Sequence, residues 1–284
     1  MIKDLLGIYR MVLKRATLHH AVNKGKSMAV QALLKHYANI HARGNCSWTA
    51  LHHASNYGHP DVIHILLEHG ANIEAQNRDQ NRPLHLVAWQ GKLAAAQALL
   101  EHQASVDARQ DYSYTPLHYA AFYDHPDRIQ LLIEHGADLE AQSNEQDTSL
   151  HLAAWKGKLT PAERLLEHGA IGHVRNKAGW TPLHYASCHG CLDVLQLLLE
   201  HRADADAQDD ERATPLHLAV ANGKTEAARL LLERGASTHA RNKDRQTPFQ
   251  KASETGSQEI MELLREHMLR RRMTRSVPPT SQSE

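Results

Sequence analysis

Histidine is the residue type in this sequence best suited to chemistry, and one short stretch is rich in it. The segment "WTALHHASNYGHPDVIHILLEHG" spans residues 48–70 and holds five imidazoles within 18 positions: His52, His53, His59, His64 and His69. Clustered imidazoles commonly hold zinc, which needs ligands that converge on one ion at roughly 2 Å. The question is whether these side chains converge on one place or belong to a pattern.

The histidines belong to a repeat of 33 residues. One lattice contains His19, His52, His85, His118, His151, His184 and His217, with Gln250 in the eighth place. A second lattice contains His36, His69, His102, His135, His168, His201 and His267, with Arg234 in the missing place. Together they account for 14 of the 23 histidines. Residues that recur every 33 positions lie in successive layers of a stack, so the sequence argues against a zinc site.

Two further lattices share the 33-residue step. Glycines recur at Gly25, Gly58, Gly91, Gly157, Gly190, Gly223 and Gly256, with Asp124 as the one replacement. Leucines recur at Leu33, Leu66, Leu99, Leu132, Leu165, Leu198, Leu231 and Leu264. A period of 33 with boxes such as "TPLHYAA" and "TPLHLAV" resembles the ankyrin repeat, over eight units in residues 15–272. The resemblance implies an all-α repeat solenoid, a stack of helix–turn–helix units with β-hairpin fingers, in which the boxed imidazole has a structural role.

Local signals are consistent with two short helices in each repeat. Thr115 can cap a helix whose first turn holds Pro116, where a missing N–H costs nothing. Glycines such as Gly58 end the first helix, and Pro60 fits the first turn of the second. Alternate repeats also resemble each other more than neighbours do. The functional unit therefore looks like a pair of repeats, 66 residues long.

Composition limits the function classes. Lysine plus arginine equals aspartate plus glutamate, at 32 each, so no global field points to nucleic acid or to a membrane surface. No apolar run is long enough to span a bilayer. Three cysteines cannot form a disulfide framework, and we expect a reducing compartment, the cytoplasm or alternatively the nucleus. The sequence lacks a phosphate-binding glycine loop, an HExxH motif and a G-x-S-x-G elbow, so we expect neither an enzyme nor a bound cofactor.

The resemblance places partner contacts on the finger tips and the inner, concave helices. All four tryptophans fall in those positions. The candidate partner-binding residues are Trp48, Tyr57, Trp89, Tyr114, Phe122, Tyr123, Trp155, Trp180 and His189. Exposed aromatic side chains anchor many protein interfaces, although they can also simply pack on a neighbouring finger. We expect a monomeric scaffold or adaptor that holds one or more proteins or extended peptides on this face.

Three smaller signals leave alternatives open. Cys188, His189 and Cys191 form a C-x-x-C with an adjacent imidazole, which is typical either of a redox or metal site or of ordinary surface thiols. His20 and His53, which follow the boxed histidine, are interpreted as surface residues. The basic segment "LRRRMTRS" (residues 269–276) could be a nuclear-import or acidic-partner patch, could present Thr274 to a basophilic kinase, or could simply complement the dipole at the end of the final helix. It supports an alternative function, a regulatory or nuclear-acting module whose tail carries specificity.

The ends and the finger tips depart from the family pattern. Residues 1–14 match no repeat and are predicted to form a capping segment, the eighth repeat a C-terminal cap, and residues 273–284 a disordered tail. The finger-tip glycine of the family survives only as Gly179. Its place is otherwise taken by Lys14, Ser47, Gln80, Ser113, Gln146, Arg212 and Arg245. Those turns must use another geometry or accept strain at positive φ.

Overall fold

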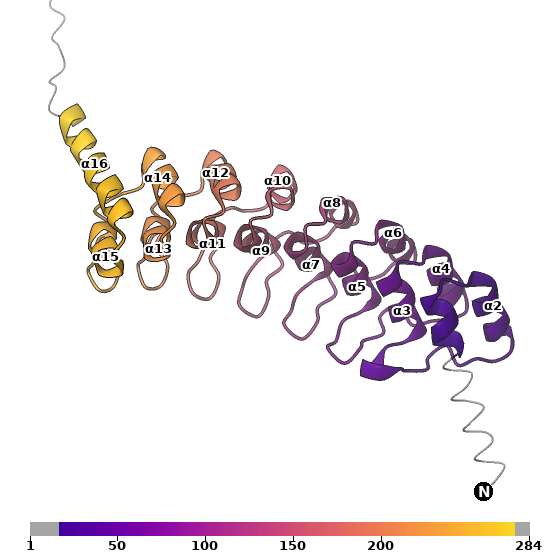
Figure 1. The fold of residues 1–284 in the computed structure, drawn as a ribbon. Helices are drawn as coiled ribbons and strands as arrows, with labels where there is room; N and C mark the ends of the chain where they lie inside the picture. The colour runs from indigo at the N-terminus through magenta and orange to yellow at the C-terminus, as the bar shows by residue number, and fades with distance from the viewer. Residues whose placement is uncertain (1–16, 276–284) are drawn as a thin grey trace, which may run out of the picture. The chain divides into compact units, whose positions relative to one another are not determined.

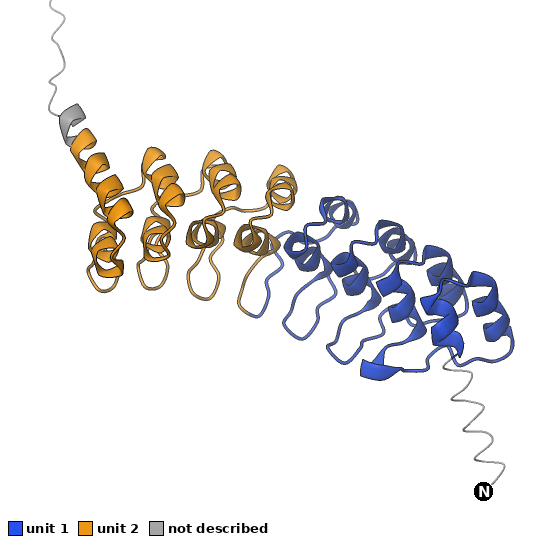
Figure 2. Ribbon diagram, in the orientation of Figure 1, with its two compact units in different colours: residues 1–144 blue, residues 145–284 orange. Residues whose placement is uncertain are grey.

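The computed structural model describes residues 17–275, which divide between two compact units, Met1–Asn144 and Glu145–Glu284 (Figure 2). The segment predicted as an N-terminal cap (residues 1–14) lies outside the described residues. Helices and turns make up the described part of both units, and no strand is formed within it. Each unit contains two rows of short helices joined by long loops, the fingers, that project to one side (Figure 1).

The described part of unit 1 begins with helical residues 17–23, after which seven further α-helices and one 3₁₀ turn follow. These elements are α2 (Ser27–Lys35), η1 (Asn45–Ser47), α3 (Ala50–Tyr57), α4 (Pro60–Glu68), α5 (Pro83–Gln90), α6 (Leu93–Glu101), α7 (Pro116–Phe122) and α8 (Pro126–Glu134). Helices α3, α5 and α7 pack side by side in the first row, next to the fingers, and α2, α4, α6 and α8 form the second row (Figure 1).

Unit 2 repeats the same arrangement. Its helices are α9 (Ser149–Lys156), α10 (Leu159–Glu167), α11 (Pro182–His189), α12 (Leu192–Glu200), α13 (Pro215–Ala221), α14 (Thr225–Glu233), α15 (Pro248–Thr255) and α16 (Gln258–Arg275). Helices α9, α11, α13 and α15 form the first row, and α10, α12, α14 and α16 the second (Figure 1). Helix α16 is described through Arg275, beyond residue 272, where we expect the repeats to end. Residues 276–284 lie outside the described part.

The first-row helices begin in the predicted way. Thr115 is the N-cap of α7 and Pro116 its first residue, where the absent proline N–H leaves no intrahelical bond unmade. The backbone N–H of Thr115 donates to Nδ1 of His118, 3.1 Å away. The imidazole thus satisfies a backbone donor at the helix start, where no intrahelical acceptor exists. The same box recurs in both units, including α11 with Thr181 and His184.

The leucine lattice lies between the two rows and forms the core of each unit. Its buried members are at most 1% exposed: Leu66, Leu99, Leu132, Leu165, Leu198, Leu231 and Leu264. Leu33 is only half-buried. Small residues such as Ala54 and Ala186, both fully buried, allow first-row helices to approach closely. Burial of one such leucine contributes about 2 kcal/mol, so the repeated stripe carries much of the stability.

The fingers are tight turns rather than the expected β-hairpins with regular strands. In one finger the Asn77 side-chain oxygen accepts from the backbone N–H of Asp79 (3.0 Å) and of Asn81 (2.9 Å). Neighbouring fingers share single backbone bonds, such as Arg78 N–H to Cys46 O at 2.9 Å. One such bond between fingers does not make a continuous ladder. The asparagine turn therefore sets the finger shape, and strands are absent from residues 17–275.

The strain predicted for the finger tips is present. Residues in the place of the family glycine have φ between +56° and +61°: Ser47, Gln80, Ser113, Gln146, Arg212 and Arg245. Gly179, the one glycine at this place among the described residues, has φ of +75°. Side chains other than glycine adopt this left-handed region at a cost of about 1 kcal/mol or more. The finger turn is therefore fixed by its surroundings and not by the residue at its tip.

Candidate partner-binding surface

The boxed histidines connect successive repeats. In five of them the Nε2 atom lies near a backbone carbonyl oxygen 29 residues further on: 3.0 Å for His52 and Asn81, 3.1 Å for His85 and Tyr114, 3.1 Å for His151 and Trp180, 3.3 Å for His184 and Ala213, and 3.0 Å for His217 and Gln246. A carbonyl only accepts, so Nε2 carries the proton, and Nδ1 accepts from the N-cap backbone. Both ring nitrogens of these histidines therefore make hydrogen bonds within the fold.

Burial keeps these imidazoles neutral. It lowers the pKa of His52, His85 and His184 from the ordinary 6.5 to about 4 in each case. The pKa values of His151 and His217 are also lowered, again mainly by burial. The second histidine lattice has a local role, because Nδ1 of His69 lies 2.8 Å from the Ile65 carbonyl at the end of α4. Within residues 17–275 no three metal-ligating side chains are gathered in one place.

The aromatic side chains of unit 1 gather around Tyr119 on α7. We call this group cluster 1, comprising Trp89, Tyr114, Tyr119, Phe122 and Tyr123. The ring of Tyr119 lies 6.2 Å from Trp89, 6.2 Å from Tyr114 and 6.3 Å from Tyr123, measured between centroids. The Tyr119 and Tyr123 rings are almost parallel, at 6°, and Phe122 meets Tyr123 edge-on at 4.9 Å. The sequence-predicted residues of α5 and α7 are thus brought together.

Polar bonds hold the centre of cluster 1 in place. The Gln110 amide donates to the Tyr119 hydroxyl at 3.2 Å, and this hydroxyl donates to Oδ1 of Asn81 at 3.3 Å. Burial raises the pKa of Tyr119, so the phenol stays protonated and able to donate. His125 Nε2–H donates to the Trp89 carbonyl at 2.9 Å, which fixes the end of α5. The aromatic rings are therefore ordered before any partner arrives.

Cluster 1 keeps part of its aromatic surface in solvent. Trp89 is 38% exposed and Tyr123 39%. Tyr114 and Phe122 are half-buried. Exposed aromatic area held in a fixed geometry loses little conformational entropy on binding. This is the property expected of an interface anchor rather than of a core residue.

The remaining candidates of unit 1 are Trp48 and Tyr57. Trp48 is half-buried, with its ring 5.1 Å from the ring of His53. Tyr57 is 49% exposed and stacks on His59 at 6.3 Å. Burial, followed by the nearby His19 and His52, lowers the pKa of His53 to about 4. His53 is half-buried, so its side chain is partly at the surface and partly in contact with the Trp48 ring.

Unit 2 carries an equivalent group 66 residues further on, which we call cluster 2: Trp155, Trp180, Tyr185 and His189. The Tyr185 ring lies 6.2 Å from Trp155 and 5.0 Å from Trp180, and His189 lies 6.4 Å from Trp155. Trp180 Nε1–H donates to Oδ2 of Asp209 at 3.1 Å. Trp155 and Trp180 are half-buried and His189 is exposed. Cluster 2 is therefore polar where cluster 1 is aromatic, with His189 in the place of Tyr123.

The hydroxyl of Tyr185 is held like that of Tyr119. It accepts from the Asn176 amide at 3.3 Å and donates to Asp147 Oδ2 at 3.4 Å. Tyr119 and Tyr185 were not among the predicted site residues, although both organise a cluster. The available signal was the alternation of "LHY" with "LHL" boxes, which places a tyrosine beside the structural histidine only in every second repeat.

The charges beside the two clusters differ. The ammonium of Lys156 lies 4.6 Å from the centre of the Trp155 ring. The pKa of His189 is lowered by burial first and then by Lys224 and Lys156. At the place of Lys156, cluster 1 has Gln90, which carries no charge. Cluster 2 thus has a cation, Lys156, at the position where cluster 1 has the uncharged Gln90.

The Cys188 and Cys191 thiols do not have the features of a redox or metal centre. Burial raises the pKa of both thiols, which reduces the thiolate needed for reaction or for metal binding. Sγ of Cys188 accepts from the Asn222 amide at 3.4 Å. No metal-binding group of three or more side chains, with or without His189, occurs in the described part of the chain.

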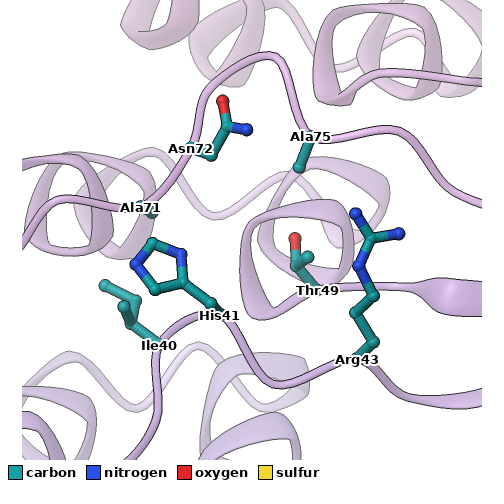
Figure 3. Close-up of a pocket in the computed structure, with 7 residues that line it drawn as sticks. All are labelled: Ile40, His41, Arg43, Thr49, Ala71, Asn72 and Ala75. Atoms are coloured by element: carbon teal, nitrogen blue, oxygen red, sulfur yellow. The ribbon is translucent and has the colours of Figure 1, made fainter.

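Two pockets between fingers lie away from the clusters. One is a pocket of about 80 Å³ between two fingers of unit 1, lined in part by Ile40, His41 and Arg43 (Figure 3). Figure 3 shows these side chains facing Thr49 and the loop of Asn72. A pocket of about 260 Å³ occurs at the matching place in unit 2, beside Arg175. Both volumes are below the range usual for ligand sites, about 300–1,000 Å³.

Comparisons with known proteins agree with the repeat architecture. The family described as ankyrin repeats (3 copies) matches residues 2–77, 18–110, 75–143, 139–209 and 202–273. A search of curated proteins returned no significant match. The described residues contain no helix with the length and apolar character needed to cross a membrane. The overlapping matches span nearly the whole sequence and agree with the paired helix rows and the linking histidines, so the chain belongs to the ankyrin repeat family.

Proposed function

We propose that this chain is an adaptor that binds a partner protein or an extended peptide on its exposed aromatic surfaces, cluster 1 in unit 1 and cluster 2 in unit 2. Ankyrin repeats are generally protein–protein interaction modules, and proteins built from them are typically non-enzymatic scaffolds. The observation that carries the proposal is the partly exposed and tethered aromatic surface of cluster 1, with Trp89 38% and Tyr123 39% exposed. Ordered aromatic side chains of this kind are the commonest anchors of protein interfaces.

The surroundings of the clusters favour a macromolecular partner over a small molecule. The pockets of about 80 Å³ and 260 Å³ lie between fingers, not at the aromatic rings. The exposed rings of cluster 1 offer a contact surface without a deep pocket, which suits a peptide or a protein surface. We propose a monomer that acts in the cytoplasm, or alternatively in the nucleus, without a cofactor or catalytic activity. The balanced charge gives no reason to propose nucleic acid or a membrane as partner.

The test is affinity capture from cell lysate with quantitative mass spectrometry. One variant carries alanine at Trp89, Phe122, Tyr123 and Trp155. A control variant carries alanine at Met28 and Leu192, which are 86% and 39% exposed and lie on second-row helices outside both clusters. Circular dichroism first establishes that all three proteins melt alike. Partners lost only from the cluster variant support binding on this face, whereas partners kept by all three proteins refute it.

The alternative is a regulatory or nuclear-acting module in which the basic C-terminal segment carries specificity. One observation favours it: α16 continues to Arg275, and the side chain of Arg270 is 81% exposed. The same capture with Arg270→Gln and Arg271→Gln separates the two functions. Partners that this variant loses and the cluster variant retains would favour the basic segment.

A further inference from the structure

We propose that cluster 1 binds a basic side chain, an arginine or a lysine, presented by an extended segment of the partner. The inference rests on the proposed function and names the chemistry of the partner. Two independent differences between the equivalent clusters carry it: an aromatic face without its own cation, and a pair of carboxylates at the neighbouring finger tips.

The first difference concerns the tryptophan face. In unit 2 the last residue of α9 is Lys156, whose ammonium lies 4.6 Å from the centre of the Trp155 ring. The last residue of α5 in unit 1 is Gln90, beside Trp89. Within residues 17–275 no lysine or arginine lies over the Trp89 ring. Trp155 in unit 2 therefore has an ammonium group over its ring, whereas the equivalent Trp89 in unit 1 has none among the described residues.

The ring geometry of cluster 1 suits a cation. The Trp89, Tyr119 and Tyr123 rings are within 31° of parallel, and their centroids are 5.7–6.3 Å apart. Trp89 and Tyr123 keep 38% and 39% of their surface exposed, and a cation is attracted to the face of an aromatic ring within about 6 Å. Arginine has a further advantage, because its planar guanidinium also stacks on aromatic rings.

The second difference concerns the finger tips. In unit 2, Glu145 and Lys177 on neighbouring fingers form an ion pair at 3.7 Å, and Glu211 and Lys243 form the equivalent pair at 2.8 Å. The matching positions in unit 1 are Asp79 and Asp111, both exposed carboxylates. Asp79 is close enough to cluster 1 to raise the pKa of Tyr119, a smaller effect than burial.

Two like charges at neighbouring positions are unfavourable until a cation joins them. Lysine fills this place in both equivalents of unit 2, so a partner lysine or arginine is the group that completes it in unit 1. The same basic segment can lie along the aromatic face and reach the two carboxylates. Charge complementarity of this sort contributes more to specificity than to total affinity.

The test uses the full chain and two short probes. They are acetyl-Gly-Arg-Gly-amide and the same peptide with citrulline, which keeps the shape of arginine without its charge. The indole N–H signals of the four tryptophans are assigned by single Trp→Phe variants and followed by ¹H–¹⁵N NMR during titration. We expect the arginine peptide to shift the Trp89 signal and to bind about two- to fivefold more tightly than the citrulline peptide.

Exchanging the residues that distinguish the clusters gives matched controls. Gln90→Lys should weaken the response of Trp89, and Lys156→Gln should create a response at Trp155. Asp111→Lys, which copies the ion pair of unit 2, should also weaken binding at Trp89. All three positions are exposed, and equal melting curves would confirm intact folding. Equal shifts with arginine and citrulline, or no change on the Gln90/Lys156 exchange, would overturn the inference.

The outcome is separable from that of the proposed function. If the arginine peptide binds at Trp89 but alanine at the clusters leaves every captured partner in place, the charge preference stands and the adaptor function on this face fails. If partners are lost with the cluster variant and the two peptides bind equally, the adaptor function stands and the preference for a basic side chain fails.

Discussion

The Nε2 atom of His85 lies 3.1 Å from the backbone carbonyl oxygen of Tyr114 in the next repeat. Nδ1 of the same ring accepts from the N–H of Arg82, at 3.2 Å. A buried structural histidine therefore holds the backbone of an aromatic residue in cluster 1, and His151 does the same for Trp180 in cluster 2. The bond from the Arg82 N–H requires the neutral imidazole, because a protonated Nδ1 cannot accept.

Stability should fall as the solution is acidified. His52, His85 and His184 have pKa values of about 4 in the fold against 6.5 ordinarily. Between these values the unfolded chain binds protons that the folded chain does not, so the loss begins near pH 6.5 and is complete near pH 4. Each histidine accounts for about 3 kcal/mol over that window. Urea unfolding followed by circular dichroism at pH 7.5, 6 and 5 measures it, and equal midpoints would contradict it.

Glutamine provides the matched control for this prediction. Gln250 occupies the place of the boxed histidine in the last repeat, where its Oε1 accepts from the Thr247 N–H at 2.9 Å. His184→Gln should keep that local bond and lose the bond to the Ala213 carbonyl. We expect a cost of about 1 kcal/mol at pH 7.5 and a shallower decline of stability toward pH 5.

Much of the fold could be predicted from the spacing of residues. The 33-residue lattices placed the linking histidines and the leucine core, and the missing finger-tip glycines indicated positive φ at positions such as Gln80. The alternation of repeat types also indicated that features recur after 66 residues. These properties are local or strictly periodic, so a single sequence contains them.

The organisation of the aromatic surface could not be predicted in the same way. Trp89 and Tyr123 could be predicted as site residues, but the central role of Tyr119 depends on its bonds to Gln110 and to Asn81, 38 residues away. The strands of the expected fingers are likewise absent from residues 17–275, because side-chain-capped turns replace them. The bond from Tyr119 to Asn81 joins different repeats, and the order of residues does not state which side chains meet.

Glycine at a strained finger tip should stabilise the protein. Gln80 has φ of +56°, a conformation that glycine adopts without the steric cost of a Cβ atom. After allowance for the greater freedom of glycine in the unfolded chain, Gln80→Gly should gain about 0.5–1 kcal/mol in urea unfolding. The opposite change, Gly179→Ala, should cost at least as much, because its Cβ would lie 2.7 Å from the Asp210 backbone nitrogen. A loss of stability with Gln80→Gly would show that its side chain outweighs the strain.

Two substitutions of Tyr119 should distinguish the role of its hydroxyl in stability from the role of its ring in partner binding. Tyr119→Phe loses the bonds to Gln110 and Asn81 and should destabilise unit 1 by about 1 kcal/mol, with ring packing retained. Partner capture should therefore remain close to that of the unchanged chain. Tyr119→Ala removes the ring on which Trp89 and Tyr123 pack and should reduce capture as well. Equal capture by the phenylalanine and alanine variants would argue against an organising role for this ring.

The three cysteines should differ in their rate of alkylation. Cys46 is exposed, whereas Cys188 and Cys191 are half-buried and their pKa values are raised by burial, against the opposing effect of Lys224. Alkylation proceeds through the thiolate, so iodoacetamide at pH 7.5 should modify Cys46 several-fold faster than the other two. Timed quenching and peptide mass spectrometry would give the three rates, with a denatured sample as the control in which they converge. If Cys188 or Cys191 reacted first, an activated thiolate would be present and the redox interpretation of this C-x-x-C would return.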